Sequence, residues 1–298
     1  MNIGLIGYGA VAGLHLRALS TLPGVAVTVW GPDPDRARAF AGSSAVPAPT
    51  LDDLLDAVDA VLVASPSGLH DDQVARALQA GRSVLVEIPA CHSLEAGRSA
   101  AARAADGELL LRAAHTSRYL AGYVAVGAML AGARLGRIVR VTYTRDVVPR
   151  PRSWRDDVLR HHAFHPIDLL RSWFGDATVQ AAMITTEAGQ PSAIDAQLTF
   201  GIGVETHIAI RYVPSGGRAC LRIEGEGAAL ETDGFSWLRA DTLGIDRSWD
   251  AETTYAASIV DQDRDFVESI RTARVGPDWP ETLQSVAIVD AIARYGTA

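Results

Sequence analysis

The 298-residue sequence contains no lysine, so all 27 of its basic residues are arginines. This absence excludes a Schiff base, an ammonium general acid and a lysine phosphate anchor from the chemistry of the chain. Cysteine is scarce too, and Cys91 and Cys220 lie far apart in unlike surroundings. We therefore expect no disulfide framework, and such sparing use of cysteine is typical of a reducing cytoplasm.

Long apolar runs and clusters of basic residues are also missing. No apolar run approaches the roughly 20 residues that a membrane-spanning helix needs. The first residues, Met1 to Gly7, are apolar but lack a basic segment, which is typical of a buried strand rather than a signal peptide. The net charge of -8 comes without a basic face for phosphates. We expect a cytoplasmic protein that binds neither membranes nor nucleic acid.

The first third of the chain alternates short apolar runs with amphipathic helical patterns, as βαβ units do. Near-continuous apolar strands are typical of a parallel sheet that helices cover on both faces. Right-handed crossovers between such strands give a doubly wound α/β sheet, which we assign to residues 1–117. The predicted strands are Ile3–Ile6, Val25–Trp30, Val61–Ala64, Ser83–Glu87 and Leu109–Arg112.

The pattern changes after residue 117. Several strand-like runs follow one another between Val179 and Arg239 without helices, which predicts a mostly antiparallel sheet. We assign residues 118–298 to an α+β domain for substrate binding and dimerisation, whose last helix can pack back on the first domain. The other predicted elements are a strand at Ile138–Arg145 and helices at Tyr119–Leu130, Val158–Phe174, Asp261–Thr272 and Glu281–Tyr295.

A glycine-rich loop follows the first predicted strand and opens a helix. It reads Gly7-Tyr8-Gly9-Ala10-Val11-Ala12, a G-x-G-x-x-A pattern. Gly7 permits the tight turn, Gly9 lets the backbone approach a pyrophosphate, and Ala12 is small enough for the helix to pack on the sheet. The free N–H groups at the start of the helix favour an anion. We expect these six residues to bind a dinucleotide, which makes the first domain a Rossmann domain.

The end of the second predicted strand bears on the type of coenzyme. An acid usually stands there to bond the adenine ribose, but this chain has Gly31, with Asp33 two residues further on. The missing carboxylate removes repulsion towards a 2′-phosphate, and Arg36 is close enough in sequence to pair with one. We expect NADP or NAD, with NADP favoured. Asp33 alternatively caps the next helix.

Several further motifs, in their order along the chain, resemble those of the Gfo/Idh/MocA family, the relatives of glucose–fructose oxidoreductase and inositol dehydrogenase. The resemblance covers nearly the whole chain and therefore implies one family for both domains. It is carried by Ala64–His70, Ala77–Gly81, Val84–Pro89, Arg118-Tyr119, Leu135–Ile138, Trp154-Arg155, His165–Leu169 and Phe266–Ile270.

The resemblance implies a fold, a coenzyme and an assembly. The family joins a Rossmann domain to a domain built on an open antiparallel sheet, which often forms the dimer interface, so we expect a homodimer or a higher homo-oligomer. Its substrate sits between the domains against the nicotinamide. Carried over to this chain, the residues at the nicotinamide end of the coenzyme are Ser65, Pro66, His70, Glu87 and Ile88, and Pro89 follows a cis peptide bond.

Two departures from the family pattern fall on the chemistry. The family's Glu-Lys-Pro is Glu87-Ile88-Pro89 here, so the lysine that usually touches the reacting hydroxyl is an isoleucine. The family's Asp-x-x-x-His is His161 to His165, so its aspartate is a histidine. An apolar side chain at residue 88 suits an apolar or planar substrate edge better than a polyol.

His165 is the remaining candidate for proton transfer. On a regular helix His161, His165 and Asp168 lie on one face, at i, i+4 and i+7. A second histidine beside His165 favours the neutral imidazole, which is a suitable base near neutral pH. We expect His165 and His161 to be catalytic and no metal to bind, since no third ligand follows the pair. The candidates for substrate contact are Arg118, Tyr119, Trp154, Arg155 and Asp168.

Three functions remain open from the sequence. The first is an NAD(P)-dependent oxidoreductase that transfers a hydride to or from a small sugar-like, cyclitol or carbonyl substrate. The second is a non-redox enzyme in which His161 and His165 perform acid–base chemistry in an elimination, isomerisation or cyclisation. The third is a catalytically silent protein that senses a dinucleotide.

Overall fold

The computed structural model describes residues 1–149, 157–201, 203–273 and 278–296. The chain divides into two compact units. The first unit comprises Met1–Thr116 and Ile259–Leu283, and the second comprises Ser117–Ser258 and Gln284–Ala298. The first unit therefore includes a C-terminal segment that the simple division at residue 117 assigned to the second domain.

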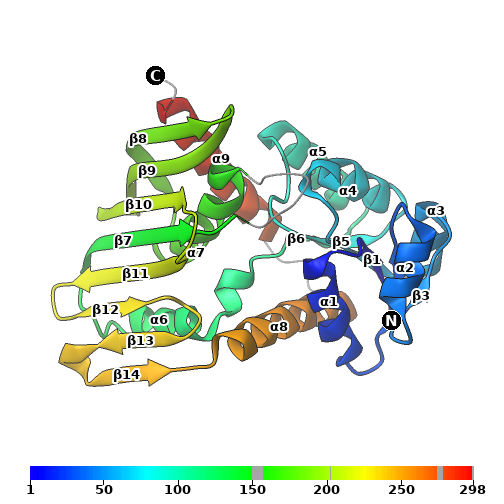
Figure 1. Ribbon diagram of the computed structural model, residues 1–298, viewed down its shortest axis with the longest axis horizontal. Helices are drawn as coiled ribbons and strands as arrows, with labels where there is room; N and C mark the ends of the chain where they lie inside the picture. The colour runs from blue at the N-terminus through cyan, green and yellow to red at the C-terminus, as the bar shows by residue number, and fades with distance from the viewer. Residues whose placement is uncertain (150–156, 202, 274–277, 297–298) are drawn as a thin grey trace. The chain divides into compact units, whose positions relative to one another are not determined.

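The first unit contains a sheet of six parallel strands in the order β3-β2-β1-β4-β5-β6 (Figure 1). This order, which reverses beside β1, is that of a Rossmann domain and confirms the predicted doubly wound sheet. Every residue of β4 and β5 is buried, as expected for strands with helices on both faces. The strands are β1 (Asn2–Ile6), β2 (Ala26–Trp30), β3 (Val46–Pro47), β4 (Ala60–Val63), β5 (Ser83–Val86) and β6 (Leu111–Ala113).

The helices of this unit begin at well-defined caps. Thr50 forms a reciprocal capping box with Asp53, and the side chains of Asp33 and Ser93 each accept hydrogen bonds from the first turn that follows. The helices are α1 (Ala10–Ser20), α2 (Pro34–Ala41), α3 (Leu51–Ala57), α4 (His70–Gln79) and α5 (Leu94–Asp106), with a short 3₁₀ turn at Ser67–Leu69. A second 3₁₀ turn, Thr116–Tyr119, begins at the last residue of Met1–Thr116 and continues into the second unit. Helix α8 (Ala251–Arg271) adds Phe266 and Val267 to the same apolar core as β1.

The second unit is built on an eight-stranded sheet in the order β14-β13-β12-β11-β7-β10-β9-β8 (Figure 1). Neighbouring strands are antiparallel except β7 and β10, which run parallel, so the prediction of a mostly antiparallel sheet is confirmed. The strands are β7 (Ile138–Val147), β8 (Ala177–Glu187), β9 (Gln190–Phe200), β10 (Val204–Tyr212), β11 (Arg218–Gly225), β12 (Ala229–Thr232), β13 (Trp237–Ala240) and β14 (Ile245–Ser248).

The two faces of this sheet differ in chemistry. Alternate residues such as Val141, Tyr143, Ile208 and Ile223 are buried on one face. Helix α6 (Ala121–Ala131) joins the β12–β13 turn through a hydrogen bond from Gly122 N, and α7 (Phe164–Phe174) packs against β9. Helix α9 (Asp278–Gly296) is the last element. The other face is polar and carries ion pairs.

Two expectations about the whole chain can be compared with the structure. Cys91 is buried and Cys220 is half-buried, and no disulfide joins them. Across the described parts of the chain, every helix is too short or too polar to cross a membrane.

Candidate functional site

The glycine-rich loop between β1 and α1 has the shape of a phosphate-binding turn. Gly7 has a φ of +120°, and a Cβ atom there would lie 2.6 Å from the carbonyl oxygen of Ala64, so only glycine fits. A Cβ atom on Gly9 would meet nothing within 4 Å, so the space beside this residue is open. Gly9 caps α1 without a side-chain hydrogen bond, which leaves the first amides of the helix available to an anion. Ala12 is fully buried in the core, as the third position of the motif requires.

The predicted residues at the end of β2 lie together. The ring of Tyr8 covers Gly31, where a Cβ atom would lie 2.2 Å from that ring. The guanidinium carbon of Arg36 lies 4.6 Å from the centre of the Tyr8 ring, in cation–π contact. Asp33 caps α2, because its Oδ1 accepts hydrogen bonds from the amides of Asp35 and Arg36. The alternative role for Asp33, as a helix cap, is therefore present in the fold.

Two loops at the carboxyl edge of the same sheet are tied together by His70. This side chain is buried, with Nδ1 2.8 Å from the carbonyl oxygen of Pro89 and Nε2 3.0 Å from that of Ser65. The Ser65 hydroxyl donates a hydrogen bond to Gln73. The structure thus places His70 as a support between the loops after β4 and β5. The peptide bond between Ile88 and Pro89 is cis, as expected, and Ile88 is buried.

Sequence reasoning missed two residues that are linked to Glu87 by hydrogen bonds: one contacts it directly, and the other contacts the first. His15, on α1, is completely buried, and its Nε2 lies 2.9 Å from Oε1 of Glu87. Its Nδ1 lies 2.9 Å from Oδ2 of Asp263, on α8. The available signal was a histidine on the apolar face of α1, since a buried charged group needs partners. Its partner Asp263 is distant in sequence and gave no comparable signal.

The candidate catalytic histidines lie at an irregular point of the second unit. Residues Val158–Ala163 form a π-helical turn that Asp157 caps, and α7 begins only at Phe164. The predicted segment Val158–Phe174 is therefore not a single α-helix. The prediction that His161, His165 and Asp168 lie on one face of a regular helix is wrong, because His161 is in the π turn. The rings of His161 and His165 are still neighbours, 5.8 Å apart and edge to face. Single π turns inside helices are frequent at functional sites.

Asp168 and Arg118, both candidates for substrate contact, are paired with each other. The guanidinium of Arg118 donates two hydrogen bonds of 2.8 Å to the two oxygens of Asp168. Asp168 is 1% exposed and also accepts a hydrogen bond from Ser285. Tyr119 is half-buried in the same unit. Trp154 and Arg155 lie outside the described residues.

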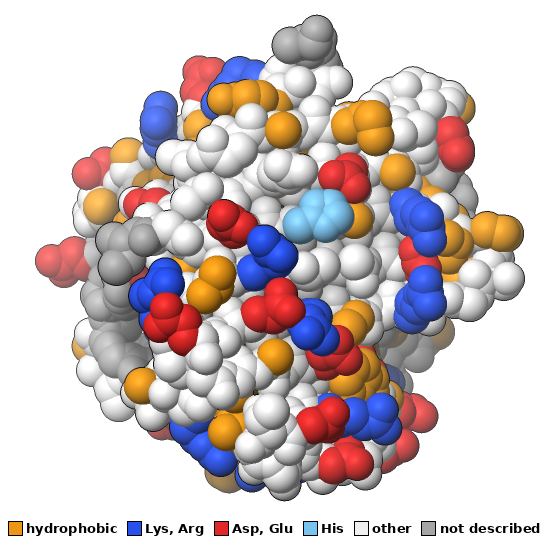
Figure 2. Space-filling model, turned by 90° about the vertical axis from the view of Figure 1, so that its left-hand side faces the viewer, with side chains coloured by type: hydrophobic (Ala, Val, Ile, Leu, Met, Phe, Trp, Pro, Cys, Tyr) orange, Lys and Arg blue, Asp and Glu red, His pale blue; other side chains and the backbone are white. Residues whose placement is uncertain are grey.

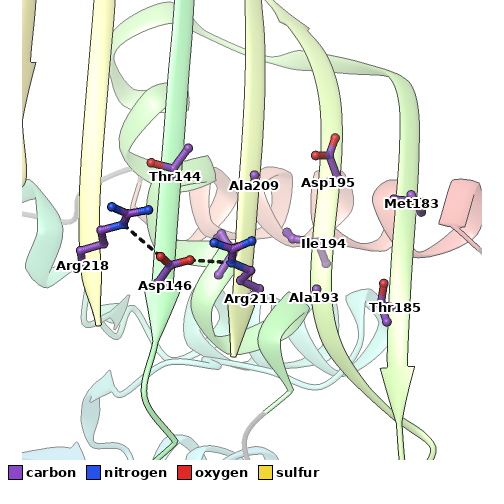
Figure 3. A pocket seen from close by; sticks show the side chains of 11 residues that line it. Thr144, Asp146, Met183, Thr185, Ala193, Ile194, Asp195, Ala209, Arg211 and Arg218 are labelled. Carbon is purple, nitrogen blue, oxygen red and sulfur yellow. Dashed lines mark hydrogen bonds and ion pairs between the residues drawn. The ribbon is translucent and has the colours of Figure 1, made fainter. Parts of the chain in front are cut away.

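A hollow of about 350 Å³ lies on the polar face of the eight-stranded sheet (Figure 3). Asp146 stands between Arg211 and Arg218 and accepts a hydrogen bond from each, and these contacts, that of Arg211 first, hold its pKa below the usual value. The described residues that line this hollow include none of the predicted site residues. Within the described segments, no group of three or more histidine, cysteine or acidic side chains could hold a metal ion.

Comparison with known proteins assigns this chain to a family. Residues 1–115 match the Gfo/Idh/MocA family, described as an oxidoreductase family with an NAD-binding Rossmann fold. Over 244 residues the chain is 30% identical to an inositol 2-dehydrogenase of Cereibacter sphaeroides, an alignment that covers 77% of this chain and 73% of that protein. The chain belongs to the Gfo/Idh/MocA family. It is accordingly an NAD(P)-dependent oxidoreductase.

Other proteins are similar over still more of the chain. A 4-carboxy-2-hydroxymuconate-6-semialdehyde dehydrogenase of Sphingobium sp. is 26% identical over 92% of this chain and 91% of its own length. A 3-ketoreductase from Actinomadura kijaniata, solved in complex with NADP and TDP-benzene, superposes with a TM-score of 0.86 at 22% identity, over 99% of this chain and 97% of that chain. The second comparison shows a shared fold that covers both units.

Proposed function

We propose that this Gfo/Idh/MocA oxidoreductase transfers a hydride between NADP or NAD and a small sugar-like, cyclitol or carbonyl substrate, with His165 as the proton donor or acceptor. The observation that carries the proposal is the loop from Gly7 to Ala12, where a forced glycine turn and an open helix start fit a pyrophosphate. The coenzyme, when bound, supplies or accepts the hydride. The chain must supply coenzyme binding, substrate orientation and a proton.

His165 is proposed as the proton-transfer group because the usual alternative is missing. Ile88 occupies the position of the family lysine, and the chain has no lysine anywhere else that could replace it. His161 stands edge to face with His165, and a neutral imidazole neighbour adds no charge that would hold His165 as an imidazolium. A neutral His165 accepts a proton from an alcohol as it is oxidised, and the imidazolium returns a proton to a carbonyl as it is reduced.

Ile88 also bears on the choice of substrate. Its side chain is buried beside Glu87, so it offers no hydrogen bond to a hydroxyl group. We propose that the substrate presents an apolar or planar edge to this side chain, in place of a fully hydroxylated ring. The name of the Sphingobium relative, a semialdehyde dehydrogenase, is compatible with a carbonyl substrate of this kind.

We propose NADP as the preferred coenzyme. Arg36 is exposed and stacked on Tyr8, at the end of β2. A guanidinium fixed in this way forms charge-assisted hydrogen bonds with a phosphate. The Asp33 carboxylate, although near, already accepts two amide hydrogen bonds as the cap of α2. Arg36 is therefore the side chain proposed to pair with a 2′-phosphate.

We also propose a cytoplasmic homodimer, or a larger homo-oligomer, that forms through the polar face of the eight-stranded sheet. This face pairs Arg140 with Glu205 and His207 with Asp195, so acidic and basic groups alternate across it. The surface in Figure 2 likewise intersperses basic and acidic side chains instead of gathering one sign. Such a face can match a second copy of itself about a two-fold axis. The mass of the protein in solution, measured by light scattering, tests the assembly.

The test of the reaction is spectroscopic. Purified protein is incubated with NADPH or NADH and a panel of ketoses, inosose-type ketones and planar aldehydes, and the loss of nicotinamide absorbance is followed. We expect oxidation of NADPH with at least one carbonyl class, and none in a Gly9→Asp variant. Substrate turnover that leaves the nicotinamide unchanged, and that persists in Gly9→Asp, would instead support the non-redox acid–base enzyme.

A further inference from the structure

Three ionisable side chains form a buried chain in the first unit. Glu87 follows β5 at the carboxyl edge of the sheet, His15 comes from α1, and Asp263 comes from α8. The side chains of His15 and Asp263 are both 0% exposed, and that of Glu87 is 17% exposed. Only Glu87 therefore reaches the surface, at the edge where Rossmann domains bind their ligands.

The hydrogen-bond geometry around His15 favours a charged ring. Each ring nitrogen faces a carboxylate oxygen, at 2.9 Å on the Glu87 side and 2.9 Å on the Asp263 side. Ionised carboxylates only accept hydrogen bonds, so a ring held between two of them donates from both nitrogens and is an imidazolium. Burial alone would lower the pKa of His15, but the charge and hydrogen bond of Asp263, and then those of Glu87, outweigh burial and raise it to about 10.

The imidazolium in turn sets the state of Glu87. Burial favours the protonated carboxyl group, but the hydrogen bond and charge of His15 outweigh it, so the pKa of Glu87 is lowered. The amide of Ile88 and the charge of His70 act in the same direction. Behind His15, burial raises the pKa of Asp263, although His15 and Gln262 oppose this. Asp265, two positions after Asp263 on α8, forms an ion pair with Arg112.

We propose that His15 and Asp263 are positioning residues, which hold the Glu87 carboxylate ionised and in one orientation so that it accepts a hydrogen bond from a hydroxyl group of the coenzyme. The inference rests on the proposed function, because it needs a coenzyme at this edge. It adds a role for helix α8, whose Asp263 supports the coenzyme site through His15. In this arrangement the affinity for coenzyme does not change between mildly acidic and mildly alkaline pH.

The test is the pH dependence of coenzyme binding, measured as the Kd for NADH, which carries no titrating 2′-phosphate, from nicotinamide fluorescence between about pH 5.5 and about pH 9. The wild-type Kd stays constant. In His15→Gln, a neutral side chain replaces the cation, the pKa of Glu87 rises, and the Kd increases about tenfold or more as the pH falls and Glu87 is protonated. In the double variant His15→Gln with Glu87→Gln, binding is weak but independent of pH. A purely structural role for His15 would lower the Tm without creating this dependence.

Asp265→Asn is the matched control. It removes a carboxylate from the same helix, but this carboxylate pairs with Arg112 and not with His15. The Kd of this variant for coenzyme stays constant with pH. If His15→Gln does not fold, Asp263→Asn takes its place, and in this variant the Kd changes at alkaline pH, where His15 loses its proton.

Nitrogen NMR of the His15 ring in the wild type measures its charge without coenzyme. Protons on both nitrogens near pH 8.5 support the inference, and a neutral ring overturns it. A constant Kd in His15→Gln also overturns it. If the wild type binds no dinucleotide, the proposed function fails even where NMR finds the imidazolium.

Discussion

The ring of Tyr8 takes the space that a side chain at residue 31 would occupy, because Gly31 has no Cβ atom to displace it. The guanidinium of Arg36 lies over this ring, so the loop after β1 contacts the helix after β2. This relationship joins the phosphate loop to the end of the site where the two coenzymes differ, and it makes the coenzyme preference testable with single substitutions.

Arg36→Gln is expected to weaken NADPH binding about tenfold and to leave NADH binding unchanged, since it removes a charge-assisted hydrogen bond to the 2′-phosphate. Arg38→Gln is the matched control: Arg38 is on the same helix, is exposed and pairs with Asp35. Calorimetric titration of each variant with both coenzymes provides the check. An equal loss for NADPH and NADH would show that Arg36 does not recognise the 2′-phosphate.

Asp168→Asn is expected to destabilise the second unit by about 3 kcal/mol, because it leaves the Arg118 guanidinium without its buried carboxylate partner. Arg137→Gln is the comparison, since the Arg137–Glu226 pair is exposed and is worth about 0.5 kcal/mol or less. Urea denaturation followed by circular dichroism measures both. Equal effects of the two substitutions would contradict a structural role for the Arg118–Asp168 pair.

His165→Gln is expected to lower kcat about a hundredfold or more, because the substrate loses its proton donor or acceptor. The Kd for coenzyme should not change. His162→Gln serves as the comparison, since it removes a neighbouring ring, which packs edge to face on His161 and Tyr212. Steady-state rates and coenzyme titrations separate the two quantities. A kcat that His165→Gln leaves intact would remove this residue from the mechanism.

The charge of His15 also predicts how stability depends on pH. Its pKa is raised from 6.5 in the unfolded chain to about 10 in the folded chain, so its contribution is complete below pH 6.5 and is lost as the pH rises through 10. The difference in Tm between the wild type and His15→Gln should therefore shrink as the pH rises from 6.5 to 10. Differential scanning calorimetry at several pH values measures the difference, and two parallel curves would refute the buried imidazolium.

Apolar patterning predicted most of the first unit. The strands β1, β2, β4 and β5 lie within a residue or two of their predicted positions, since each is a continuous apolar run. The two-residue strand Val46–Pro47 has no such run and was missed. Helix α8 begins at Ala251, ten positions before the predicted start at Asp261. The cap that was missed is Asp250, whose Oδ1 accepts a hydrogen bond from the amide of Thr253.

The candidate site was predictable only in part. Local motifs indicated the phosphate loop, the cis bond before Pro89 and the histidine-bearing helix. The π turn at Val158–Ala163 was not predictable, because side-chain periodicity does not reveal a shift in backbone hydrogen bonding. The contact between His15 and Asp263 joins residues 248 positions apart, and no pattern in a single sequence encodes such a pair.

The central claim is that a nicotinamide dinucleotide binds across the loop from Gly7 to Ala12, and calorimetric titration of the wild type and of Gly9→Asp with NADPH tests it most directly. The space beside Gly9 is open, so the substitution leaves the fold intact and places a carboxylate where the pyrophosphate binds. We expect micromolar binding by the wild type and a loss of about a hundredfold or more in the variant. No heat of binding in the wild type, or equal affinity in the two proteins, would contradict the account.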